Sequence, residues 1–277
     1  MNSRREMMAA LAAAGLALGA RKGKPLGVQL YTIRSLVPAK ARESIQALAQ
    51  IGFKEVETLR AINTIVLPLC KEFGLKPVAG HFDLALITTH PQKAIDEAQA
   101  AGIKYVVIPY VPNGERGGPD VYKRMAKPIN EAGELCAKAG LQLCYHQHAF
   151  EFGEVQGQRP WDILLSETDP RTMALELDVF WVAVAGLDPA KLIRDLKGRV
   201  KLLHLKDKAP GVPKQYSEAV SPGAFREVGL GALDFPAILK AAAEMKVEHY
   251  FVEQDQTAGD PIESVRTSYR NLAKLGF

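Results

Sequence analysis

With 277 residues, 47% of them hydrophobic and 24% charged, and a formal net charge of +4, the chain has the composition of a folded globular protein and not that of a disordered or coiled-coil chain. Its lysines and arginines are scattered and not interleaved with aromatic residues, so the charge pattern does not predict nucleic-acid binding. The three cysteines have no CxxC spacing, which argues against a thiolate metal site or a disulfide framework.

Residues 1–22 resemble an export signal. The adjacent Arg4 and Arg5 precede the small-residue run MMAALAAAGLALGA, which is too short to span a bilayer as a helix of about 20 residues. The arginine pair favours a twin-arginine signal, although Met7 stands where such signals usually have Phe. The alternative is an amphipathic N-terminal helix on a cytoplasmic protein. We expect a periplasmic protein whose folded domain is 23–277, with no membrane contact after signal removal.

Eight short apolar runs follow, and each is typical of a buried strand. They are LGVQLY (26–31), FKEVE (53–57), LKPVAG (75–80), KYVVIP (104–109), LQLCYH (141–146), MALELD (173–178), VKLLHL (200–205) and HYFVEQ (249–254).

Helical patterns separate these runs, with apolar residues three and four positions apart. Four of the intervening segments end in a glycine just before a strand, as helix C-termini commonly do: Gly52, Gly74, Gly102 and Gly140. Eight βα units in about 250 residues predict a single-domain α/β fold, the (β/α)₈ TIM barrel. An open doubly wound sheet is the alternative, but YTIRSLVP follows the first strand where a glycine-rich phosphate loop would stand. The long segment 207–231 after the seventh strand is a candidate lid.

The strand ends carry an unusual set of side chains. In a barrel of this kind the C-terminal strand ends hold the chemistry, and here they offer His81, His146 and His148, Asp178, His204 with Lys206, and Glu253. Taken singly, Asp178 could cap a turn, His204 could be a hydrogen-bonded core histidine and Glu253 could pair with a lysine. Taken together, the groups on strands 5 to 8 would converge, and a bound cation would offset the cost of burying them. Nitrogen and oxygen ligands without thiolate suit one Mn²⁺, Zn²⁺, Co²⁺ or Mg²⁺ ion.

Seven segments carry a family resemblance: GVQLYTIR, GFKEVE, CYHQHAFEF, LELDVFWV, LLHLKDK, VGLGALDFPAILKAA and YFVEQD. Over residues 25–277 the chain resembles the xylose isomerase-like TIM-barrel superfamily, often labelled sugar phosphate isomerase/epimerase. The resemblance implies one divalent metal held from strands 5 to 8, with Asp178, His204 and Glu253 as ligands. Epimerases of the superfamily usually have a glutamate at the end of strand 5, whereas His146 matches that position here. His146 is then the fourth ligand, and Glu151 could replace the missing carboxylate.

The remaining roles follow from this placement. Glu253, or Glu151 if it reaches, would be the general base. Lys206 and His81 would hold hydroxyls or an oxyanion, with a surface ion pair and a strand-end hydrogen bond as the plainer alternatives. His148 and Trp181 would contact substrate, although Trp181 could be plain packing. Glu176 lies one layer deeper, as a further ligand or as a partner of Lys206.

Three functions fit this site. The first is a metal-dependent isomerase or epimerase of a sugar or keto-sugar, acting through a metal-stabilised enediolate. The second is a lyase or dehydratase on a keto-sugar or keto-glycoside, which the histidine at strand 5 favours because two-base epimerisation loses a partner. The third is a non-catalytic, exported sugar-binding barrel. The sequence argues against a three-metal DNA-repair endonuclease, because it offers too few histidine and glutamate positions and no basic groove. The chain could form a homo-oligomer.

Overall fold

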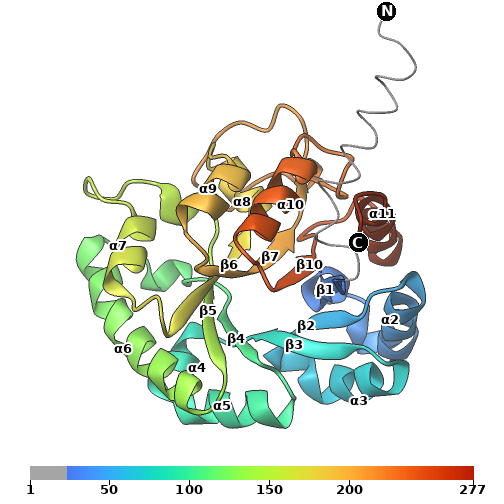
Figure 1. The fold of residues 1–277 in the computed structure, drawn as a ribbon, viewed down its shortest axis with the longest axis horizontal. Coiled ribbons are helices and arrows are strands. Elements are labelled where there is room, and N and C mark those ends of the chain that lie inside the picture. The colour runs from blue at the N-terminus through green and yellow to red at the C-terminus, as the bar shows by residue number, and fades with distance from the viewer. Residues whose placement is uncertain (1–23) are drawn as a thin grey trace, which may run out of the picture.

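The computed structural model describes residues 24–277, and the predicted signal segment lies outside them. Eight parallel strands close into a barrel in the order β1-β10-β7-β6-β5-β4-β3-β2, and helices surround it (Figure 1). The predicted (β/α)₈ barrel is confirmed. Its strands are β1 (Gly27–Gln29), β2 (Glu55–Leu59), β3 (Lys76–His81), β4 (Tyr105–Ile108), β5 (Gln142–His146), β6 (Met173–Asp178), β7 (Val200–Leu205) and β10 (His249–Val252).

Each of the eight strands overlaps the run that predicted it. The helices between them are α2 (Val37–Ile51), α3 (Asn63–Phe73), α4 (Leu84–Thr89), α5 (Pro91–Ala100), α6 (Pro119–Lys138), α7 (Pro160–Glu167), α8 (Val179–Val184), α9 (Pro189–Asp195), α10 (Phe235–Glu244) and α11 (Pro261–Lys274). Short 3-10 turns are η1 (Leu30–Ile33), η2 (Arg60–Ile62), η3 (Asn113–Glu115), η4 (Phe150–Phe152) and η5 (Pro222–Ala224). The last helix, α11, packs beside α2, which brings the two ends of the described chain to one side of the barrel (Figure 1).

The glycines predicted to end helices adopt positive φ angles. Gly74 is a left-handed cap at φ 73°, and its N–H bonds to the carbonyl of Cys70. Gly52 is held at φ 121°, where a Cβ would also meet the Tyr269 hydroxyl at 2.4 Å. Glycine is therefore required at Gly52 both by conformation and by space.

Side-chain alternation divides the core into two parts. Val78, Ala79, Tyr105, Val107, Cys144, Ala174, Leu202 and Phe251 form a small apolar cluster inside the barrel. The larger cluster lies between strands and helices and includes Tyr145 of β5. Because neighbouring residues on a strand point to opposite faces, Cys144 and His146 face the interior while Tyr145 faces the helices.

The segment 207–231 is more ordered than a plain loop. It contains a two-stranded antiparallel pair, β8 (Asp207–Lys208) with β9 (Phe225–Arg226). The buried Asp207 carboxylate accepts hydrogen bonds from four backbone N–H groups, those of Lys208, Gly229, Gly231 and Leu233, at 2.7–3.1 Å. The Asp207 carboxylate of the HLKD motif thus holds the backbone of the GLGALDF motif in place.

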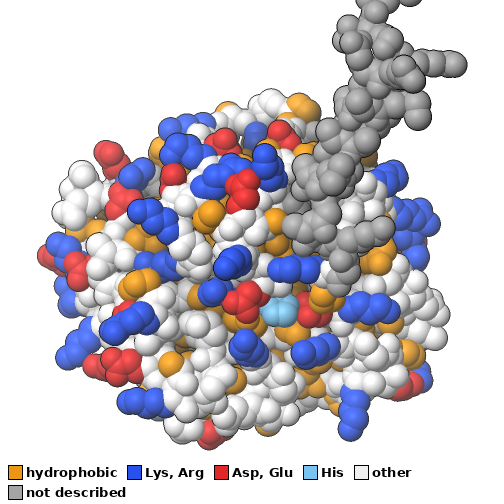
Figure 2. Space-filling view, in the orientation of Figure 1, with side chains coloured by type: hydrophobic (Ala, Val, Ile, Leu, Met, Phe, Trp, Pro, Cys, Tyr) orange, Lys and Arg blue, Asp and Glu red, His pale blue; other side chains and the backbone are white. Residues whose placement is uncertain are grey.

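Among residues 24–277 no helix has the length and apolar character needed to cross a membrane. On the face shown in Figure 2, basic and acidic side chains are interspersed.

Candidate metal centre and active-site pocket

Four predicted ligands meet at the carboxyl end of the barrel. His146 ends β5, Asp178 ends β6, His204 lies on β7 and Glu253 directly follows β10. Each offers one nitrogen or oxygen atom, and these four atoms all lie within 4.8 Å of one another. All four side chains are buried. The strands therefore deliver two imidazoles and two carboxylates to a single point.

Hydrogen bonds behind the cluster set the tautomers of both histidines. The Nδ1 of His146 lies 2.9 Å from the carbonyl of Pro109, so it carries the proton and Nε2 keeps a lone pair. The Nε2 of His204 lies 2.6 Å from Glu57 Oε2, so a proton on Nε2 would let Nδ1 offer its lone pair to a metal. Histidines that bind metal characteristically donate their other N–H to a carbonyl or carboxylate. Both imidazoles are thus oriented as metal ligands.

The atoms that face the centre of the cluster lack hydrogen bonds from the described residues. They are His146 Nε2, Asp178 Oδ2 and His204 Nδ1. His146 Nε2 lies 3.5 Å from Asp178 Oδ2, and His204 Nδ1 lies 2.8 Å from Glu253 Oε2. The Lys206 ammonium lies 2.9 Å from Asp178 Oδ2 and compensates part of its charge. Buried polar atoms without hydrogen bonds are costly, and a divalent cation would bind all three. The group is able to hold a metal ion with nitrogen and oxygen ligands.

Lys206 is a buried ammonium beside the ligands. Its Nζ lies 2.9 Å from Asp178 Oδ2, 2.7 Å from Glu253 Oε2 and 2.6 Å from Asp255 Oδ1. Burial opposes its charge, but Asp178, Asp255 and Glu253 outweigh burial and raise the lysine pKa well above its usual value. Burial likewise opposes ionisation of Asp178 and of Glu253, and Lys206 is the largest opposing influence that lowers both carboxyl pKa values. This lysine is therefore protonated in the site before any substrate binds.

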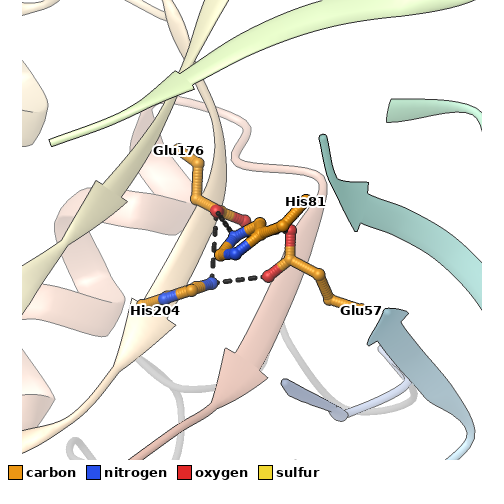
Figure 3. Close-up of side chains that lie close together, drawn as sticks. All are labelled: Glu57, His81, Glu176 and His204. Carbon is orange, nitrogen blue, oxygen red and sulfur yellow. Dashed lines mark hydrogen bonds and ion pairs between the residues drawn. The ribbon is translucent and has the colours of Figure 1, made fainter. Parts of the chain in front are cut away.

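A second group of polar side chains lies deeper in the barrel than the four ligands, around the Nε2 side of the His204 ring (Figure 3). Glu57 of β2, His81 of β3 and Glu176 of β6 surround His204 Nε2. His81 Nε2 lies 3.4 Å from Glu57 Oε1 and 3.3 Å from Glu176 Oε2. Glu176 was expected either as a further ligand or as a partner of Lys206. The structure shows no pairing with Lys206, because Glu176 contacts His81 and His204 instead.

The pocket above the ligands has a volume of about 470 Å³. Its walls include the predicted substrate contacts His81, His148 and Trp181, together with Lys206 and Glu253. The rings of His148 and Trp181 lie 5.2 Å apart. All three predicted substrate contacts thus reach the same pocket.

Glu151 does not reach this pocket. It lies in η4, and its carboxylate accepts hydrogen bonds from the Tyr145 hydroxyl at 2.8 Å and from the His148 backbone N–H at 2.9 Å. Tyr145 faces the helices, so Glu151 lies behind β5. Burial raises the Glu151 pKa to about 7. The expectation that Glu151 replaces the strand-5 carboxylate or acts as base disagrees with this geometry.

The predicted lid segment contributes to the pocket through Glu218. Glu218 Oε2 pairs with Arg116 at 2.7 Å, and Glu218 Oε1 lies 3.7 Å from His148 Nε2. The Arg116 guanidinium also stacks 3.4 Å from the centre of the Phe150 ring. Three loops are thereby linked at the mouth of the pocket.

Three site residues escaped the sequence analysis: Glu57, Asp255 and Glu218. Glu57 had a usable signal, because GFKEVE places it at a strand end with the same alternation as the other inward groups. Asp255 follows Glu253 by two positions, a weaker signal beyond the end of β10. Glu218 had none, since it belongs to an irregular segment.

Comparisons with known proteins agree with this fold. The curated inosose dehydratase of Clostridium botulinum is 25% identical over 254 residues, which cover 80% of this chain and 85% of that relative. A sugar phosphate isomerase/epimerase structure from Parabacteroides distasonis superposes with a TM-score of 0.76 at 24% identity, covering 92% and 94% of the two chains. The IOLI protein, solved with a zinc atom, superposes with a TM-score of 0.70 at 16% identity over 91% and 98%. The family model described as xylose isomerase-like TIM barrel matches residues 83–275, more than half of the sequence. The chain therefore belongs to the xylose isomerase-like TIM barrel family.

Proposed function

We propose that this protein is a divalent-metal-dependent lyase that removes water from a keto-sugar or keto-polyol. The observation that carries the proposal is the ligand set, in which His146 occupies the strand-5 position and Glu151 lies behind the barrel wall. A two-base epimerase needs a base on each side of the reacting carbon, whereas β-elimination needs one base and a nearby proton donor. The similarity to an inosose dehydratase supports the same choice.

The metal would be held by His146, Asp178, His204 and Glu253, and when bound it would supply Lewis-acid polarisation of the substrate carbonyl. Mn²⁺, Zn²⁺, Co²⁺ and Mg²⁺ all suit these ligands. The zinc atom of the IOLI protein supports zinc as one of them.

Glu253 and Lys206 form the proton-transfer pair. Glu253 takes the proton from the carbon next to the carbonyl, a C=C bond forms, and the bond from the β-carbon to its hydroxyl oxygen breaks. Lys206 donates a proton to the departing hydroxide, which leaves as water. Glu253 then returns its proton to Lys206 across the 2.7 Å that separates Oε2 from Nζ. Both groups end in their starting states.

The pocket favours an uncharged substrate. Its two cationic side chains among the described residues are Lys206 and Arg60. Lys206 is enclosed by carboxylates, and Arg60 forms a two-point ion pair with Glu97 at 2.5 and 2.9 Å. Neither is free for a phosphate. Trp181 offers an apolar face to a ring, and His81 and His148 offer hydrogen bonds to hydroxyls.

The isomerase or epimerase reading uses the same metal and the same first proton transfer, and it is supported by the family's fold. The two outcomes separate after that step, because elimination removes an oxygen and isomerisation keeps every atom. The sugar-binding reading predicts neither product.

The test is an NMR product assay. Purified protein with Mn²⁺ is incubated in deuterated water with inososes, keto-sugars and aldoses. We expect an unsaturated ketone or its tautomer with loss of one water, and no product from Glu253→Gln. Glu244→Gln, a surface change on α10, is the control and should match the parent protein. Isomerised sugar without dehydration would refute the lyase, and no turnover with retained sugar binding would favour the binding barrel.

Export to the periplasm stays a prediction from residues 1–22. Mass spectrometry of the mature N-terminus after expression with its native leader checks it, because cleavage near Ala20 is expected.

A further inference from the structure

Beyond the proposed function, we propose that the deeper layer binds a second divalent cation through Glu57, His81 and Glu176. These three side chains lie beneath the first ligand set and share His204 with it (Figure 3). Glu57 and Glu176 are fully buried, and His81 is 11% exposed on the pocket wall. The cation would enter from the pocket past His81.

Gln29 lies beside the His81 ring. The Gln29 Oε1 accepts the backbone N–H of Tyr31 at 3.0 Å, which turns the amide nitrogen toward His81. That nitrogen lies 3.3 Å from His81 Nε2. An Nε2 that accepts the amide N–H would carry a lone pair, which a cation could also bind. The same Nε2 faces Glu57 and Glu176 at 3.4 and 3.3 Å. Two buried carboxylates and one imidazole nitrogen therefore point at one another.

Hydrogen bonds from the described residues do not satisfy every oxygen of this layer. The single N–H of His204 Nε2 is taken by Glu57 Oε2 at 2.6 Å. Glu57 Oε1 and Glu176 Oε1 have no hydrogen bond from the described residues, although both are buried. Leaving such oxygens unpaired is costly. A cation satisfies carboxylate oxygens and an imidazole lone pair at once.

Two of the three separations between the proposed ligands match those around a small ion. Tetrahedral ligands at about 2.0–2.1 Å from a zinc ion lie roughly 3.3–3.4 Å from one another. His81 Nε2 has this separation from both carboxylates. His204 keeps its proton on Nε2 in this arrangement and supports the second ion through Glu57, while its Nδ1 faces the first.

Charge balance supports two ions. Five carboxylates surround the two layers: Glu57, Glu176, Asp178, Glu253 and Asp255. Lys206 pairs with Asp178, Glu253 and Asp255 but reaches neither Glu57 nor Glu176, so a second cation would offset the charge of the deeper pair. Uncompensated charge in a buried site is strongly disfavoured.

The test counts ions per chain. Protein purified with Zn²⁺, then dialysed against metal-free buffer, is analysed by elemental mass spectrometry, and circular dichroism checks its folding. We expect two zinc ions in the parent and one in both Glu57→Gln and His81→Ala. The His81 variant lies on the pocket wall and serves if loss of Glu57 prevents folding. Glu55→Gln is the control, since Glu55 lies two residues earlier on β2 and pairs with His249; it should keep two ions.

Other outcomes overturn the inference. One ion in the parent means that the deeper layer is a hydrogen-bonded support for His204, and the proposed lyase stands. Two ions in both variants place the second ion elsewhere. Zero ions in the parent would remove the lyase as well.

Discussion

Replacing Lys206 by methionine tests whether its ammonium and a bound cation compensate the same carboxylates. Lys206 is 1% exposed and lies within 2.9 Å of Asp178, Glu253 and Asp255. Removing one partner from a buried ion pair costs about 3–5 kcal/mol, because the remaining charges are left unpaired. At about 2.1 cal/mol/K of unfolding entropy per residue, a barrel the size of residues 24–277 changes Tm by about 2 °C per kcal/mol. Metal-free Lys206→Met should therefore melt roughly 6–10 °C below the parent.

A bound cation should reduce that loss. Mn²⁺ would neutralise Asp178 and Glu253, which are also partners of Lys206, so the difference in Tm between parent and variant should shrink when Mn²⁺ is present. The assay is thermal and urea unfolding by circular dichroism, with chelator and with excess Mn²⁺. Lys201→Met is the matched control, since Lys201 lies on β7, the strand that Lys206 directly follows, and pairs with Glu248 at 3.1 Å near the surface. It should cost no more than about 1 kcal/mol under either condition.

An equal loss of stability in Lys206→Met with and without Mn²⁺ would show that the ammonium and the cation do not compensate the same carboxylates. A metal-free variant as stable as the parent would show that the carboxylates do not depend on the ammonium.

Three further outcomes are expected. Asp178→Asn should keep the hydrogen bonds by which Oδ1 caps the N-terminus of α8. It should weaken Mn²⁺ binding more than about 100-fold, measured by titration calorimetry. An unchanged Mn²⁺ affinity would contradict the assignment of Asp178 as a ligand. Burial raises the Glu151 pKa to about 7 in the folded protein, above its value in the unfolded chain, so the free energy of unfolding should fall by roughly 3 kcal/mol as pH rises from about 4.5 to 7. In urea unfolding, Glu151→Gln should show a smaller decrease over the same pH range. A decrease equal to that of the parent protein would refute this prediction. Gly231→Ala should destabilise by about 1–3 kcal/mol, because its Cβ would lie 2.3 Å from Asp207 Oδ1, and an unchanged Tm would show that the turn relaxes.

The sequence determined the barrel and the polar side chains at its carboxyl rim. Eight apolar runs separated by helical patterns ending in glycine leave few folds of this length, and the (β/α)₈ barrel is confirmed. Parallel strands bring their carboxyl ends to one rim, and alternation decides which residues face inward. Those two rules predicted that polar groups at the ends of strands 5 to 8 converge, and the family resemblance then singled out His146, Asp178, His204 and Glu253 as the expected ligands.

The tertiary structure decided what the ligands touch. Glu57 on β2 and Glu176 on β6 come from distant strands in the barrel order and meet across its interior, which no spacing along the chain predicts. Glu151 was misplaced because the 3-10 turn Phe150–Phe152 carries its carboxylate behind β5 to Tyr145. Periodicity fixes the face of a residue on a strand, but beyond the strand end the direction of a side chain depends on the loop and on the groups packed around it.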